Sequence, residues 1–180
     1  MSTATASPIA PAGTWAVDPV HSSVTFEIGY LGGTFKGQFR EVAAELTVEG
    51  GRASLRGSSP VASIDVKDEN LSAHLQSPDF FDAERHPTLG FRADDVQLDG
   101  ETVRVKGELT IRGATREVEL AGRAAAPLTD PYGRERVALT LATTVDRTAY
   151  GLNWNLALPT GQQALSNEVT VAANLHFVKA

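Results

Sequence analysis

The feature that most constrains this chain is a period-two alternation of apolar and polar side chains, which recurs from about residue 14 to near the C-terminus. Its clearest example covers residues 102–112, where one face carries only apolar side chains or glycine: Val103, Val105, Gly107, Leu109 and Ile111. Successive side chains of a β-strand point to opposite faces of its sheet, so this pattern predicts strands with one buried and one solvated face. The predicted fold class is therefore all-β.

Short turns separate the alternating runs. Gly50-Gly51, Asp99-Gly100 and Arg112-Gly113 can supply the positive φ of tight turns, so neighbouring strands should pair antiparallel. About eight strands are predicted, at residues 14–30, 34–49, 52–66, 87–98, 102–112, 115–128, 134–148 and 167–178. Eight long antiparallel strands tend to close on themselves, which removes exposed sheet edges and encloses room for side chains or one small ligand. The sequence thus predicts an eight-stranded antiparallel lipocalin-like barrel.

One segment, near residues 68–84, breaks the alternation and predicts a short helical insertion. Asp68 or Asn70 can cap its start. The insertion carries four large apolar side chains: Leu71, Leu75, Phe80 and Phe81. We expect it to plug one end of the barrel or to line its mouth; a helix that only caps the core is a compatible alternative.

The N-terminal residues 1–13 contain no charge and no continuous apolar stretch. They carry too few apolar side chains to offset the conformational entropy that would be lost on ordering. They are therefore predicted to form a disordered tail before one folded domain at residues 14–180. A secretory signal would need basic residues followed by ~7–15 apolar ones. The expected location is therefore cytoplasmic. No apolar run reaches the ~18 residues of a membrane-spanning helix.

Composition excludes several classes of function. The 180 residues include 16 Lys and Arg against 22 Asp and Glu, a formal net charge of −6, and no cysteine. The sequence has no cluster of Lys and Arg that could form a positively charged patch for phosphates, so nucleic acid is not an expected partner. Without cysteine it has no disulfide, thiolate metal site or Cys nucleophile.

Few polar residues are candidates for catalysis or metal binding. The four histidines lie far apart in the sequence, without the spacing of a metal site: His21, His74, His86 and His176. Each is expected to be a hydrogen-bonded structural residue. Ser22 follows His21, but adjacent strand residues point to opposite faces, so they should not form a nucleophile and base pair. Arg147 can anchor an anionic head group, although a surface ion pair is its more ordinary role. No catalytic residue, metal site or cofactor is predicted.

Motifs in order along the chain resemble the YceI-like family. They are WAVDPVHSSVTF at residues 15–26, GQF at 37–39, SID at 63–65, HLQSPDFFDAERHP at 74–87, GELTIRGAT at 107–115, RTAYG at 147–151 and NEV at 167–169. The block around Phe80-Phe81-Asp82 is the most specific. The resemblance implies an extended eight-stranded barrel that sequesters or transports an elongated apolar molecule without bond-making. A polyisoprenoid, an isoprenoid quinone or another lipid is the implied ligand, and no cofactor is required.

Alternation and resemblance together predict a lipid-binding module rather than an enzyme. The residues expected to line its interior are Phe26, Ile28, Phe39, Leu46, Leu75, Phe80, Phe81, Phe91, Leu109, Leu120, Leu139, Leu141, Val171 and Phe177. An enzyme acting on a small apolar or isoprenoid substrate is the alternative, and convergence of two among His21, His74 and Arg147 on one cavity would favour it. A filled barrel that serves as an interaction scaffold is a third possibility. An uncovered apolar strip on the exterior would indicate a homodimer.

Overall fold

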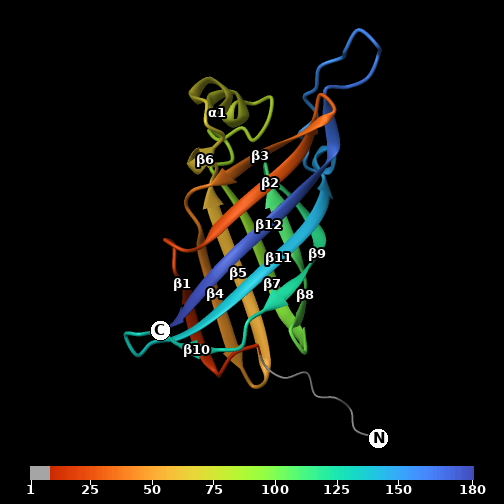
Figure 1. The fold of residues 1–180 in the computed structure, drawn as a ribbon. Coiled ribbons are helices and arrows are strands. Elements are labelled where there is room, and N and C mark those ends of the chain that lie inside the picture. The colour runs from red at the N-terminus through yellow and green to blue at the C-terminus, as the bar shows by residue number, and fades with distance from the viewer. Residues whose placement is uncertain (1–8) are drawn as a thin grey trace, which may run out of the picture.

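A computed structural model describes residues 9–180 as an antiparallel β-barrel with a short helix above one end (Figure 1). The strands are β1 (Gly13–Val17), β2 (Ser23–Tyr30), β3 (Gly33–Phe39), β4 (Ala43–Glu49), β5 (Arg52–Pro60), β6 (Ile64–Asp65), β7 (Thr88–Asp99), β8 (Thr102–Ile111), β9 (Ala114–Ala124), β10 (Leu128–Thr129), β11 (Glu135–Asp146) and β12 (Leu165–Lys179). The helical elements are α1 (Glu69–Gln76) and the 3₁₀ turns η1 (Val61–Ser63) and η2 (Arg147–Tyr150). We call the end near α1 the upper end and the end near the C-terminus the lower end.

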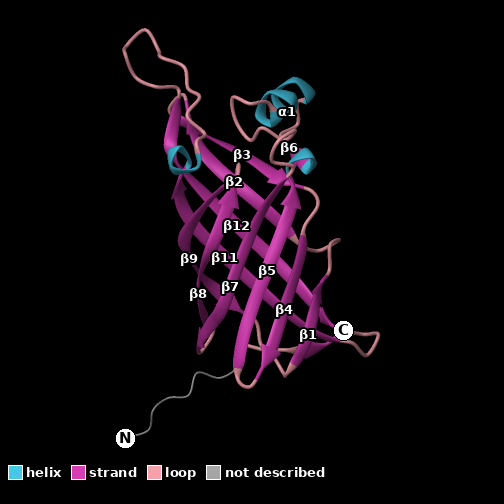
Figure 2. Cartoon of the chain, turned by 180° about the vertical axis from the view of Figure 1, so that it is seen from behind, coloured by secondary structure: helices cyan, strands magenta, loops and turns pink. Residues whose placement is uncertain are grey.

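Apart from the two-residue β10, the strands occupy eight positions around the barrel, because three long strands are each broken in two. β1 and β2 share one position, β3 and β4 the next, and β5 and β6 the third. Strand β12 pairs with β11 along one edge and with β1 and β2 along the other, which closes the ring. Figure 2 shows the opposite wall, where β4, β5, β7 and β8 run side by side. The predicted eight-stranded antiparallel barrel is confirmed.

A polar network fastens the first break to the barrel wall. Asp18, just after β1, accepts hydrogen bonds from His21 Nδ1 at 2.7 Å and from Arg136 Nη1 at 3.0 Å. Arg136 Nε also donates to Asp130 at 2.7 Å. Hydrogen bonds from Arg136 and His21 hold the pKa of Asp18 well below its usual range, and the Arg136 bond contributes most to lowering the pKa of Asp130 to about 2. The Asp18–Arg136–Asp130 network therefore joins β1 to β11 across the lower half.

The stretch over which β9 and β11 are paired, called here the seam between them, is short. It runs from the Leu139–Ala124 pair to the Ala142–Ala121 pair, whereas β11 pairs with β12 as far as Asp146. Gly122 lies in this seam, and a Cβ there would overlap the backbone carbonyl of Thr140. Only glycine permits so close an approach of the two strands. Above Ala142 the two strands are no longer paired.

The interior contains two apolar clusters. The lower cluster packs inside the barrel, and Trp15, Leu46 and Phe177 within it have no exposed surface. The upper cluster lies below α1 and η2 and includes Phe39, Phe80 and other aromatic side chains. The lower half is therefore a packed core, while the upper half brings strands, helix and loops together around the site described below.

The described part of the N-terminal segment and the helical insertion lie at opposite ends of the barrel. Residues 1–8 of the predicted tail lie outside the described residues, whereas Ile9 and Ala10 are buried in the lower cluster. Helix α1 begins after Asp68, whose side chain accepts a hydrogen bond from the Leu71 N–H at 2.8 Å. The predicted short helix is confirmed. Within the described part of the chain, no helix has the length and apolar character needed to span a membrane.

Candidate functional site

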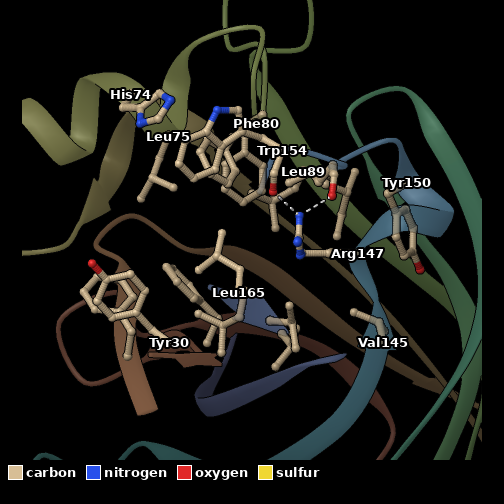
Figure 3. Close-up of a pocket in the computed structure, with 18 of the residues that line it drawn as sticks. Tyr30, His74, Leu75, Phe80, Leu89, Val145, Arg147, Tyr150, Trp154 and Leu165 are labelled. Atoms are coloured by element: carbon tan, nitrogen blue, oxygen red, sulfur yellow. Dashed lines mark hydrogen bonds between the residues drawn. The ribbon is translucent and has the colours of Figure 1, made fainter. Parts of the chain in front are cut away.

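The upper half of the barrel contains a cavity of about 320 Å³. This volume is at the lower end of the ~300–1,000 Å³ found for small-molecule sites. Its walls come from β2, β3, β7, β8, β11 and β12, from α1 and the turns that follow it, and from η2 with the loop at residues 151–164. Figure 3 shows 18 of the lining residues. Most of the lining side chains are aliphatic or phenylalanine, so the cavity is suited to an apolar guest.

The structure brings most of the predicted interior residues to this region. Eight line the upper cavity: Phe26, Ile28, Phe39, Leu75, Phe80, Phe81, Leu109 and Val171. Phe91, Leu120 and Leu141 line a smaller cavity of about 90 Å³, which shares Leu109 and Val171 with the upper one and therefore adjoins it. Leu46, Leu139 and Phe177 have no exposed surface and line neither cavity. Contact between these residues and a ligand stays a prediction.

Alternation did not identify the wall contributed by η2 and the loop after it, since loop residues have no periodicity. This wall consists of Tyr150, Leu152, Trp154, Leu156 and Ala164, and Leu165 at the start of β12 adjoins it. Asn155 fixes the loop to β12: its Nδ2 donates to the Leu165 carbonyl at 2.8 Å and its Oδ1 accepts from the Leu165 N–H at 2.9 Å. The one sequence signal nearby was the RTAYG motif at residues 147–151, which ends where the loop begins.

Three rings pack against one another between α1 and this loop. The His74 ring lies 4.8 Å from the Trp154 ring and 5.1 Å from the Phe80 ring, and Phe80 and Trp154 are 5.2 Å apart, all between centroids. His74 Nε2 is held at 3.0 Å from Asp79 Oδ2. These contacts join α1 and its following turn to the loop, so the predicted insertion both caps the upper core and lines the mouth.

Arg147 is the charged group inside the site. Its side chain is only 5% exposed. Nε donates to the Ser166 carbonyl at 2.9 Å, and Nη1 donates to the carbonyls of Leu152 at 2.6 Å and Trp154 at 2.9 Å (Figure 3 shows the last two). Burial lowers the pKa of Arg147, which the nearby Asp146 carboxylate partly offsets. The expected surface ion pair is therefore wrong: three backbone carbonyls hold this guanidinium in the wall.

Tyr150 is the second buried polar residue of the motif at residues 147–151. It is 3% exposed, and burial raises the pKa of its hydroxyl, which has no hydrogen-bond partner among residues 9–180. Gly151 follows with a φ of 81° and caps η2. The motif therefore places one buried cation, one buried phenol and a left-handed turn at the upper end.

The remaining histidines lie outside the cavity walls. His21 bonds to Asp18, and Ser22 Oγ accepts from the backbone N–H of His176 at 2.9 Å, so His21 and Ser22 do not bond to each other, as predicted. His86 lies against Gly113. Within the described chain no group of three or more metal-binding side chains was found.

Comparisons with known proteins support the fold and the motifs. The model of the YceI-like domain family matches residues 15–177. A UPF0312 protein of Staphylococcus epidermidis is 31% identical over 168 residues, covering 89% of this chain and 94% of that protein. The structure is similar to that of Burkholderia cenocepacia BcnA, with a TM-score of 0.75, 20% identity and coverage of 89% and 98% of the two chains. It is also similar to a polyisoprenoid binding domain from Saccharophagus degradans, with a TM-score of 0.68, 14% identity and coverage of 92% and 98%.

Proposed function

The chain belongs to the YceI-like domain family, and from this premise we propose that it binds an elongated apolar ligand inside the upper half of its barrel. A polyisoprenoid, an isoprenoid quinone or another lipid fits this role, which is sequestration or transport without chemical change. The observation that carries the proposal is the cavity of about 320 Å³ with its apolar wall. A cavity of that kind is stable when dry or when filled by an apolar guest.

The arrangement of the two cavities supports a long ligand rather than a compact one. Val24, Leu89, Leu109 and Val171 line both cavities, so an apolar path leads from the mouth towards mid-barrel. Each buried CH₂ group contributes ~0.8 kcal/mol, so a ten-carbon chain would gain about 8 kcal/mol before the costs of association. Association itself costs roughly 4–15 kcal/mol, so a tail longer than ten carbons offsets this cost more fully.

One observation favours the enzyme alternative: His74 and Arg147 both line the upper cavity. Trp154 lies between them, with its ring on His74 and its carbonyl on Arg147, and His74 is bonded to Asp79. The described residues that line this cavity include no serine, threonine, cysteine or acid that could act as a nucleophile or pass on a proton. We therefore propose binding rather than catalysis.

The cellular location and the oligomeric state also remain proposals. A cytoplasmic location stays a prediction. A homodimer also stays a prediction; among residues 9–180, the large apolar side chains that are most exposed are Val20 and Tyr132, both in turns rather than along a strand face.

Organic extraction of the purified protein followed by mass spectrometry tests the proposed function. We expect an elongated apolar molecule in the extract, or saturable uptake of a prenyl quinone after the lipid has been removed. Absence of both results would contradict the proposal.

A matched pair of variants locates the ligand. Val171 points into both cavities, whereas its neighbour Thr170 is exposed. Val171→Trp should weaken prenyl quinone binding at least tenfold, because displacing two CH₂ groups from the cavity already costs ~1.6 kcal/mol. Thr170→Trp should bind as the wild type does. Equal binding by both variants would place the ligand elsewhere.

A further inference from the structure

We propose that Arg147 selects ligands that carry an oxyanion head, a carboxylate or a phosphate, and holds that head inside the upper cavity. The apolar tail would then run from Arg147 past Leu109 and Val171 towards the smaller cavity. This inference rests on the proposed function, because the head is positioned by a tail that occupies the same barrel.

The hydrogen bonds of Arg147 leave one side of its guanidinium free. A guanidinium has five N–H donors. The Nε–H and the Nη1 group donate to Ser166, Leu152 and Trp154. Nη2 has no hydrogen-bond partner in the described part of the chain, and it is shielded from solvent. A buried charged donor without an acceptor is costly, so an oxygen atom of a ligand would remove that cost.

The charge of Arg147 is not balanced within the cavity. Its three partners are neutral carbonyls, and the described lining residues include no carboxylate. The neighbouring Asp146 carboxylate is exposed and accepts from the N–H and hydroxyl of Thr148 at 2.9 and 2.6 Å, so it is engaged at the start of η2. A cation in an apolar wall attracts an anion more strongly than in water and disfavours a second cation.

The free donor group is also fixed in position. Ser166 is at the start of β12, while Leu152 and Trp154 belong to the loop after η2, so two segments of the wall orient the guanidinium. Figure 3 shows the side chain extending among the lining residues below Trp154. A donor group that is already oriented costs little entropy when the ligand binds.

Tail-matched amphiphiles test this inference on the wild-type protein. Hexadecanoate, hexadecyl phosphate, hexadecanol and hexadecylamine are compared by isothermal titration calorimetry. We expect the two anions to bind roughly ten- to a hundredfold tighter than the alcohol, the size of one charge-assisted hydrogen bond, and the amine to bind weakest. Inorganic phosphate, which has no tail, should bind at least a hundredfold more weakly than hexadecyl phosphate.

Two variants test whether Arg147 causes the preference for anionic amphiphiles. Arg147→Met should bind the anions and the alcohol equally. Arg112→Met is the matched control, because Arg112 also donates to a carbonyl at the upper end, that of Gly151 at 2.8 Å, but does not line the cavity. It should keep the preference for anions.

If Arg147→Met does not fold, the pH dependence of binding to the wild type tests the same inference. The higher affinity of hexadecanoate over hexadecanol should vanish as the pH falls below the pKa of the ligand carboxyl, while hexadecyl phosphate keeps its charge and its higher affinity. Equal affinity of all four amphiphiles, or inorganic phosphate binding as tightly as hexadecyl phosphate, would overturn the role of Arg147 while the proposed function stood. Failure of every amphiphile to bind would overturn both.

Discussion

In the lower half of the barrel, Trp15, Leu46 and Phe177 belong to one buried cluster and have no exposed surface, whereas inward-facing side chains of the upper half surround a cavity. Both halves are built from the same alternating strands. They differ in closure: β9 and β11 are paired below Ala142 and unpaired above it. Alternation therefore determines which side chains face inward, while strand closure and the size of the opposing side chains determine whether they meet.

The comparison predicts unequal costs of removing a phenylalanine from the two halves. Phe177→Ala should lower the free energy of unfolding by ~3–5 kcal/mol, because it leaves a cavity in a packed core. Phe35 lines the existing cavity and is half-buried. Phe35→Ala should cost only ~1–2 kcal/mol. Urea denaturation measures both values, and equal costs would mean that the two halves are packed alike.

The seam between β9 and β11 can be tested with glycine substitutions. Gly122→Ala should destabilise the protein by ~1–3 kcal/mol, since the new Cβ overlaps the Thr140 carbonyl and forces the strands apart. At Gly57 a Cβ would lie 3.5 Å from the Ala43 carbonyl, an ordinary contact. Gly57→Ala should therefore change stability by no more than about 1 kcal/mol in either direction. Thermal denaturation of both variants compares them, and a neutral Gly122→Ala would show that the seam tolerates a wider spacing.

The smallest expected effect is a pH dependence of the lower half. The pKa values of Asp18 and Asp130 are lower in the folded protein than the ~3.9 of an unfolded chain, that of Asp130 being about 2. Their stabilisation is therefore fully present above pH ~4 and is lost as the pH falls towards 2. Arg136→Met should reduce this loss, seen as a shallower decrease of the melting temperature between pH 5 and pH 2. An unchanged decrease would mean that Arg136 does not set these pKa values.

Most of the fold could be predicted from local signals. Alternation and glycine turns predicted eight strand positions, and Asp68 was among the predicted caps of the helix. The breaks within three strands were not predicted, since they depend on distant partners. The first break, for example, contains Asp18, which is held by Arg136 from another strand.

The site was less predictable, for two physical reasons. Alternation placed Leu109 and Leu139 alike on inward faces, but what lies opposite each decides that one borders a cavity and the other is fully packed. Trp154 lies in a loop without periodicity. Arg147 was expected at the surface because an arginine is rarely buried, and only the three carbonyls around it explain its position.

The three rings at the mouth, His74, Phe80 and Trp154, have a consequence for kinetics. They connect α1 and its following turn to the loop at residues 151–164, and none of them lies in a strand, so they can separate without breaking a strand pairing. A local opening of this kind requires much less free energy than global unfolding. For a guest that leaves between α1 and this loop, the residence time is set by how often these rings part. A variant that changes the stability of the lower core would then leave the rates of loading and release unchanged.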